Sequence, residues 1–191
     1  MKTPFTGETA MQRTVTMPAD VSGRALADLK GWLGISRPDE DDLLIDLLCA
    51  SLAICEGFTG QAPIEQTIEE TVPAIRGWHC LTSRPVRSVL SLESVAVDGT
   101  RTQLAADAFG TQIEANGTAR IELKSESDAA FVAVSIRSGL ATEWDGVPGA
   151  LKQGMIRLAA FNYRDRETDR DAAPPASVSA LWRPWRVLRL T

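Results

Sequence analysis

The most constraining feature of the sequence is a mostly apolar stripe between positions 43 and 58. Its members recur at steps of three and four residues, which is the spacing of one face of an α-helix. They are Leu43, Leu44, Leu47, Leu48, Ser51, Ile54, Cys55 and Phe58. A single helix cannot bury such a stripe by itself. The rest of the chain must therefore supply a partner that covers it.

Both ends of this helix carry recognisable signals. Acidic residues at 39–42 would lie in the first turn, where the helix dipole favours negative charge. Either Ser36 or Asp39 is expected to cap the first amide groups. Gly57 and Gly60 are expected to end the helix, because glycine readily adopts the left-handed backbone found at helix ends.

Further helices are predicted before and after this one. One occupies about residues 24–33 and is expected to be capped by Ser22. A longer helix occupies about residues 149–166, and Pro148 suits its beginning. A short helix follows at about residues 178–183. The helix at 149–166 is the natural partner of the apolar stripe, so we predict a bundle of about four helices.

The middle of the chain is typical of short strands. Asp98-Gly99 and Asn116-Gly117 are strong signals for hairpin turns. Apolar or β-branched residues recur around them, at 67–72, 86–97, 109–115, 119–123 and 131–136. We therefore predict a small antiparallel β-sheet or barrel, inserted between two parts of the helical bundle.

The predicted fold class is α+β, with four regions along the chain. They are a flexible N-terminal arm at 1–21, a helical bundle from 22–62 and 147–171, an inserted β domain at 63–146, and a linker with an extended C-terminal docking segment at 172–191. Pro174 and Pro175 make the linker stiff.

No pattern in the sequence indicates catalysis or a metal site. The chain has one histidine, His79, and lacks the phosphate-binding loops and the hydrolase and metalloprotease motifs. The acidic residues at 39–42 have no second acidic cluster that would complete the oxygen ligands of a cation. We therefore expect no catalytic residue, no metal and no cofactor.

Charge and hydropathy exclude two further classes of partner. The formal net charge of −5 argues against binding nucleic acid over the whole surface. The longest apolar run, 43–55, is interrupted by Asp46 and is too short to cross a bilayer. Cys49, Cys55 and Cys80 form no spaced disulfide framework and are expected to be reduced, buried thiols.

The C-terminal segment combines arginine and tryptophan and lacks acidic residues from position 172 onward. Two interpretations stay open. The segment packs on the core of its own chain, or it docks on a partner, since tryptophan and arginine dominate the energetics of interfaces.

The order of several short motifs resembles the head–tail connector (adaptor) family of long-tailed bacteriophages and gene transfer agents. The motifs are the helix end at 56–60 (EGFTG), the strand start at 84–86 (RPV), the helix start at 147–148 (VP), the looser run at 162–167 (NYRDRE) and the terminal helix with proline and arginine. The resemblance covers about residues 24–190.

This resemblance implies a structural role in a virion or gene transfer agent particle. Family members form a closed ring of about twelve copies beneath the portal protein, extend the DNA channel and contact a tail-side stopper. The genomic DNA passes through without specific binding, and assembly takes place in the bacterial cytoplasm. The portal-binding residues that it implies are Trp182, Arg183, Trp185, Arg186, Leu188 and Arg189, and the subunit-interface residues are Arg164, Asp165, Arg166 and Glu167.

Three alternatives are kept beside the adaptor. The first is another neck component, a stopper or a tail-completion protein, although stoppers are mostly β-barrels and the helices at both ends favour the adaptor. The second is a small cytosolic enzyme with an unrecognised pocket. The third is a DNA-binding accessory protein that uses the basic C-terminal segment, whose affinity would fall steeply with salt.

Overall fold

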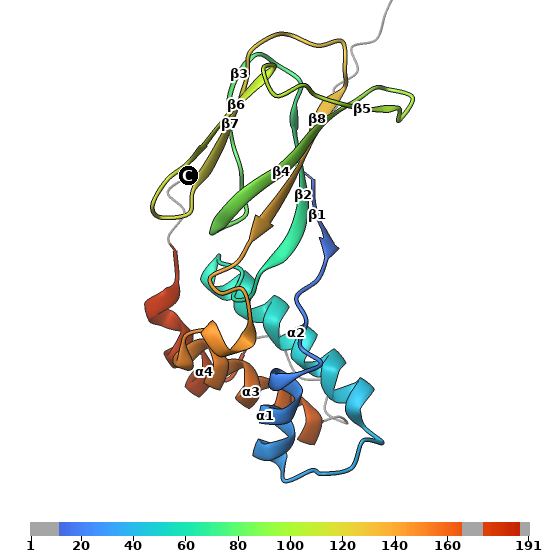
Figure 1. Cartoon of the computed structure of the whole chain (residues 1–191). Helices are drawn as coiled ribbons and strands as arrows, with labels where there is room; N and C mark the ends of the chain where they lie inside the picture. Colours follow the sequence, from blue (N-terminus) through green and yellow to red (C-terminus); the bar gives the residue numbers. More distant parts are fainter. Residues whose placement is uncertain (1–11, 166–173, 188–191) are drawn as a thin grey trace, which may run out of the picture. The chain divides into compact units, whose positions relative to one another are not determined.

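The computed structural model describes residues 12–165 and 174–187 (Figure 1). The helices are α1 (Arg24–Leu33), α2 (Asp41–Thr59), α3 (Gly149–Arg164) and α4 (Ala176–Trp182), with 3-10 turns η1 (Trp144–Gly146) and η2 (Arg183–Trp185). The strands are β1 (Arg13–Met17), β2 (Gln66–Pro73), β3 (Gly77–Cys80), β4 (Val86–Val95), β5 (Arg101–Gln103), β6 (Phe109–Ile113), β7 (Ala119–Leu123) and β8 (Phe131–Ser138). The α+β class and the four predicted helices are confirmed.

The described residues divide into two compact units. The helical unit comprises those within Pro18–Gln66, Ser83–Pro85 and Ser138–Thr191, and the strand unit those within Met1–Met17, Thr67–Thr82 and Val86–Arg137. Each unit has a separate cluster of buried apolar side chains. Each is therefore described by itself below.

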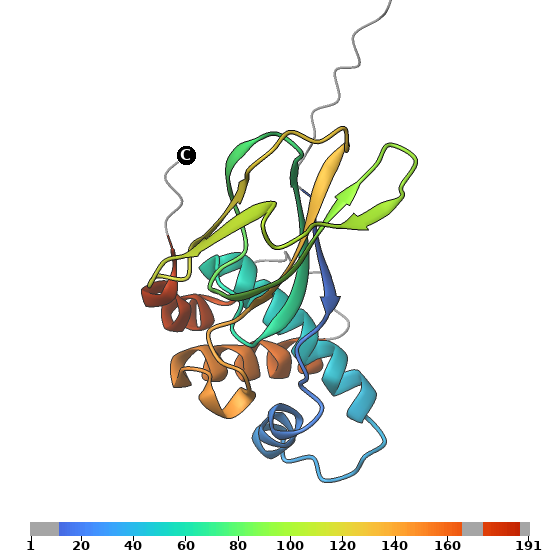
Figure 2. The ribbon, with the colours of Figure 1, turned by 45° about the horizontal axis from the view of Figure 1, so that its top comes forward.

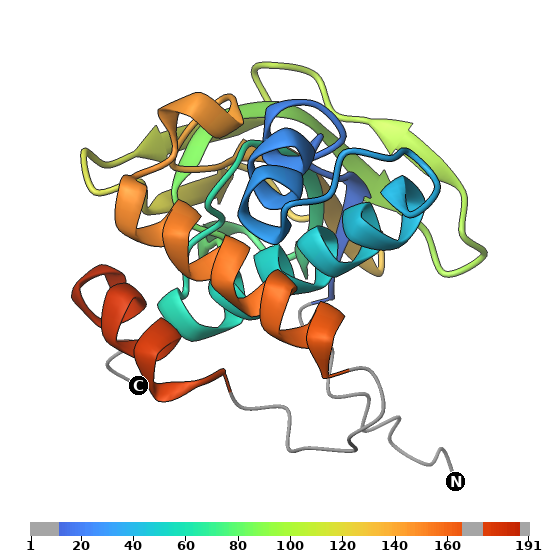
Figure 3. The same cartoon turned by 90° about the horizontal axis from the view of Figure 1, so that it is seen from below.

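The core of the helical unit forms where α2 packs on α3, and α1 packs on both (Figure 3). The buried face of α2 consists of Leu44, Leu48, Ser51, Leu52, Cys55 and Thr59. Facing residues of α3 include Leu151, Met155, Leu158 and Ala159. The helix at 149–164 therefore covers most of the apolar stripe, as predicted. The stripe was wrong at Leu43, which is 36% exposed, and it missed Leu52 and Thr59, which are buried.

Glycine ends two of the helices, α1 and α2. Gly34 and Gly60 adopt left-handed backbone with φ of 72° and 73°, and the amide of Gly60 donates to the carbonyl of Glu56 at 2.8 Å. Gly57 lies inside α2, so its predicted role as a stop is wrong.

The predicted capping side chains of α1 and α2 are also wrong. Gly23 and Glu40 hold the two N-cap positions, without a capping side-chain hydrogen bond in the described structure. The hydroxyl of Ser22 donates instead to Asp20 Oδ1 at 2.6 Å. At the start of α2 a backbone turn takes over the role of a cap, because the amide of Asp41 donates to the carbonyl of Pro38 at 3.0 Å.

The strand unit contains a five-stranded sheet, in the order β1-β2-β8-β4-β5, and a three-stranded sheet, in the order β3-β7-β6 (Figure 2). The pairs β1/β2, β4/β5, β3/β7 and β6/β7 are antiparallel. Both predicted hairpin turns form, with φ of 86° at Gly99 and 78° at Gly117. Between the sheets lie Ile68, Val72, Leu92, Ile121, Val134 and Ile136.

The predicted flexible arm at 1–21 is wrong for its second half. Residues 13–17 form β1, which pairs with β2 in the register Thr14↔Glu69. Three consecutive β-branched residues, 14–16, suit a strand, and the neighbouring edge of β2 offers backbone partners. Ala19 and Val21 are buried in the core of the helical unit. Residues 1–11 lie outside the described part.

Two short strands, β3 and β5, were not predicted. They contain four and three residues, too few to show a period in the sequence. The cysteines are free, as expected, but Cys49 and Cys80 are exposed and only Cys55 is buried.

Candidate functional site

The C-terminal segment, residues 174–187, packs on the helical unit. Pro175 precedes α4, and the amide of Val178 donates to its carbonyl at 2.9 Å. Val178 and Trp182 turn one face of α4 inward and are 1% and 0% exposed. Figure 3 shows α4 lying beside α3. The segment is thus helical over 176–182, close to the predicted helix at 178–183.

Trp182 is seated against a glycine of α3. A Cβ at Gly154 would lie 2.1 Å from the indole Nε1, so that only glycine leaves room for the ring. The indole N–H donates to the carbonyl of Leu151 at 3.4 Å. The ring also meets Phe58 of α2, with centroids 5.9 Å apart and planes tilted by 52°.

The end of the segment is tied to the end of α2. The side-chain amide of Gln61 donates to the carbonyl of Trp185 at 2.6 Å, and the amide of Val187 donates to the carbonyl of Thr59 at 2.8 Å. The guanidinium of Arg186 lies 5.7 Å from the centroid of the Phe58 ring. The chain is therefore held on the helical unit as far as residue 187.

These contacts separate the predicted portal-binding residues into three groups. Trp182 is fully buried in its own chain, and its predicted contact with a partner is wrong, because α3 already covers the ring. Arg183 and Arg186 are exposed and Trp185 is half-buried, so that these side chains share the outer surface of the segment. Leu188 and Arg189 lie outside the described residues.

The predicted subunit-interface residues begin at the end of α3. Arg164 is the last residue of α3 and is exposed. Asp165 follows it, is half-buried, and donates its amide to the carbonyl of Phe161 at 3.0 Å. Arg166 and Glu167 lie outside the described residues. The role of this run in a subunit contact stays a prediction.

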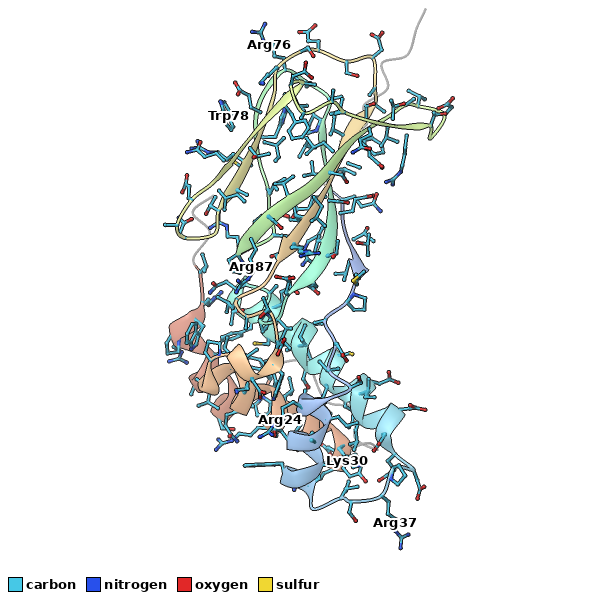
Figure 4. All side chains as sticks on the ribbon, viewed as in Figure 1. Arg24, Lys30, Arg37, Arg76, Trp78 and Arg87 are labelled. Carbon is cyan, nitrogen blue, oxygen red and sulfur yellow. The ribbon has the colours of Figure 1, made fainter. Side chains whose placement is uncertain are left out.

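Two pairs of arginine and tryptophan lie at the surface of the units. The guanidinium of Arg157 on α3 lies 5.9 Å from the Trp32 ring, and that of Arg120 on β7 lies 5.6 Å from the Trp78 ring. Trp78 points away from the three-stranded sheet (Figure 4). Neither arginine was predicted as a site residue from the sequence, although Arg157 interrupts an apolar run of a predicted helix.

The described residues were also searched for groups that could bind a metal or react chemically. They contain no group of three or more His, Cys, Asp or Glu side chains that could hold a metal ion. His79 Nε2 lies 2.7 Å from the carbonyl oxygen of Ile75. Burial, together with the nearby charge of Glu56, raises the pKa of Cys55 to about 12, which keeps this thiol protonated.

Within the described range, every helix is too short or too polar to cross a membrane.

Comparison with known proteins gives no match to a family model and none to a curated protein. Solved structures do match. The chain is 26% identical to a chain in the virion of a native gene transfer agent (GTA) particle, with a TM-score of 0.74 over 95% of this chain and 98% of that one. It is 26% identical to a chain in the neck of a native GTA particle computed with C12 symmetry, with a TM-score of 0.71 over 93% and 97%.

A third chain, from the neck of an empty GTA particle computed with C6 symmetry, is 24% identical and shares the fold, with a TM-score of 0.76 over 95% of this chain and 98% of that one. The three similarities each include nearly the whole of both chains, so the helical and strand units are matched together. The protein is therefore similar in fold and in extent to components of gene transfer agent particles and their necks.

Proposed function

We propose that this protein is a structural component of the neck, at the junction of head and tail in a virion or gene transfer agent particle. The observation that carries the proposal is the 26% identity to a chain of a GTA neck, which includes 93% of this chain and 97% of that one.

Within the neck, we assign the protein to the adaptor position. There it forms a ring of about twelve copies on the portal protein, extends the DNA channel and contacts a tail-side stopper. The C12 symmetry applied to the matched neck supports a ring of this size. The motif order described above supports the adaptor over a stopper or tail-completion protein, which are the competing assignments.

The surface that we assign to the portal is the outer face of the C-terminal segment. Arg183 and Arg186 are exposed there beside the half-buried Trp185, and the buried Trp182 holds the segment in place. Arginine and tryptophan at a surface are the residue types that contribute most to binding energy. Leu188 and Arg189 extend the same basic and apolar pattern beyond the described residues.

The test is assembly with the portal protein encoded in the same genome, followed by electron microscopy. We expect a ring stacked coaxially on the portal, and a ring placed farther toward the tail would identify a stopper instead. The double variant Arg183→Glu, Arg186→Glu should lose the portal contact. Arg76→Glu, at an exposed position in the strand unit, is the control for reversing the charge of one exposed arginine.

Truncation after Val187 is the second variant, since it leaves α4 intact. Removing the chain after Pro175 would take away Trp182 and expose the core, so that a loss of portal binding would then have two explanations. Unchanged portal binding by both variants would contradict the assigned surface, whereas absence of any association with portal or tail proteins would contradict the neck role itself.

A further inference from the structure

A few large apolar side chains of the helical unit are exposed. Among the described residues, its large hydrophobic side chains that are exposed are Trp32, Leu43 and Phe161, at 46%, 36% and 39%. Each lies next to charged side chains that form no ion pair within the described residues. They define two faces of opposite charge.

The first, the basic face, consists of Trp32, Arg157, Phe161 and Arg164. At 100° per residue, the three residues from α3 lie within about 60° of one another around the helix axis. Their neighbours on α3 are buried or half-buried, which leaves this exposed strip narrow. Arg157 is fixed over the Trp32 ring, so that the face presents aromatic carbon flanked by two positive charges.

The second, the acidic face, is the exposed side of α2. It consists of Asp42, Leu43, Asp46, Cys49, Ala50, Ala53 and Gly57. Asp42 and Asp46 have no hydrogen-bond or ion-pair partner within the described residues, whereas the adjacent Asp41 is paired with Lys30 at 2.5 Å. The small side chains that follow allow another surface to approach the helix closely.

The two faces lie on opposite sides of the α2–α3 pair. The two helices pack through their buried faces, and the exposed residues of α2 centre roughly 180° around its axis from its buried ones. On α3 the exposed strip likewise points away from the contact with α2. One copy therefore cannot join its own two faces, but two copies can join them head to tail.

We propose that the acidic face of one copy binds the basic face of the next, and that this is the lateral contact of the ring. The proposal rests on the neck role argued above. The opposite charges of the faces favour this pairing and oppose contacts between two like faces. Because the two paired surfaces differ, the contact is heterologous. Repeating such a contact from copy to copy forms a closed ring when the rotation between neighbouring copies adds up to one full turn.

Charge reversal in two separate variants tests the pairing. In a ring of Asp46→Arg copies, the reversed residue of α2 brings positive charge against the basic face of the next copy. In a ring of Arg157→Glu copies, the reversed residue of α3 brings negative charge against the acidic face of the neighbouring copy. Each variant alone should assemble at least tenfold more weakly than the natural chain. An equal mixture of the two restores opposite charge at every contact of an alternating ring, so that assembly should return.

Assembly is measured with the full chain by sedimentation and native mass spectrometry, alone and with the portal ring. Asp128→Arg and Arg76→Glu make the same changes of charge at exposed positions of the strand unit and should assemble normally. Cys49 on the acidic face should also become protected from alkylation in the ring, compared with the exposed Cys80 of the strand unit.

Three outcomes would overturn the inference. If either reversed variant assembles as well as the natural chain, the lateral contact lies elsewhere, although the neck role stands. If the mixture fails to recover assembly while both variants remain folded by circular dichroism, the two faces do not pair with each other. If the natural chain forms no ring under any of these conditions, both the inference and the adaptor assignment fail.

Discussion

Replacing Gly154 by alanine should destabilise the protein, although the same change stabilises most helices. Alanine is favoured over glycine inside a helix by about 1 kcal/mol. Here the new Cβ would lie 2.1 Å from Nε1 and 2.7 Å from Cε2 of Trp182. A normal contact needs about 3.5–4.0 Å, so the buried indole must shift by more than an ångström.

The expected size of the effect follows from these opposing contributions. Overpacking of a filled core costs about 1–3 kcal/mol, and so close an approach belongs at the upper end. After the gain in helix propensity, Gly154→Ala should lower the free energy of unfolding by about 1–2 kcal/mol. Removing the ring with Trp182→Ala should cost more, about 3–5 kcal/mol, because it leaves a cavity.

Urea denaturation of the full chain measures both variants and their combination. In the Trp182→Ala background, the alanine at 154 meets no ring and should raise the free energy of unfolding by up to about 1 kcal/mol. The effect of Gly154→Ala on stability therefore changes sign when the ring is absent. Gly57→Ala is the matched control: Gly57 is exposed on α2, nothing lies within 4 Å of its Cβ position, and alanine should stabilise there. A Gly154→Ala variant as stable as the natural chain would refute the account of this contact.

Three further predictions concern other parts of the fold. Gly139→Ala should destabilise severely in a thermal melt, because its Cβ would lie 2.4 Å from the backbone nitrogen of Glu65, which has little freedom to move; an unchanged midpoint would contradict this. The hydrogen bonds from Arg101 hold the pKa of Glu69 below its ordinary value of 4.5. These hydrogen bonds should add about 1 kcal/mol or less to the free energy of unfolding, because the pair is half-exposed. The stabilisation should be complete above pH 4.5 and should disappear as the pH falls through the lowered pKa of Glu69. Glu69→Gln should remove this pH dependence from the free energy of unfolding. Cys55 should resist alkylation at pH 8 in the folded protein, and rapid modification would contradict its burial and its pKa of about 12.

The main elements of the fold could be predicted from local patterns. The period of the stripe on α2 predicted most of its buried face, with the exception of the exposed Leu43. Left-handed glycines end α1 and α2 at Gly34 and Gly60. The Asp-Gly and Asn-Gly pairs marked both hairpin turns. Each of these signals depends on neighbours in the sequence, which explains why sequence reasoning detects them.

The errors arise where a distant part of the chain decides the conformation. Residues 13–17 resemble a polar arm by themselves and become β1 because β2 offers an edge to pair with. The helix caps were wrong because backbone turns replaced the expected side chains. For the same reason, the sequence alone left open whether the C-terminal segment docks on its own chain.

The candidate surface was predicted only in part. Arg183 and Arg186 were identified from composition and lie exposed, but the burial of Trp182 depends on Gly154, 28 positions earlier in the chain. A glycine inside a predicted apolar helix is a signal of close packing, and it was available in the sequence. The pairing of Arg157 with Trp32 joins α3 to α1 and needed the three-dimensional structure.

Electron microscopy of this protein assembled with its portal protein tests the adaptor assignment directly. We expect a closed ring, coaxial with the portal and in direct contact with it, in which the acidic face of α2 in each copy meets the basic face of the next. A protein that stays monomeric beside the portal, or one that binds only to tail-side proteins, would contradict the adaptor assignment.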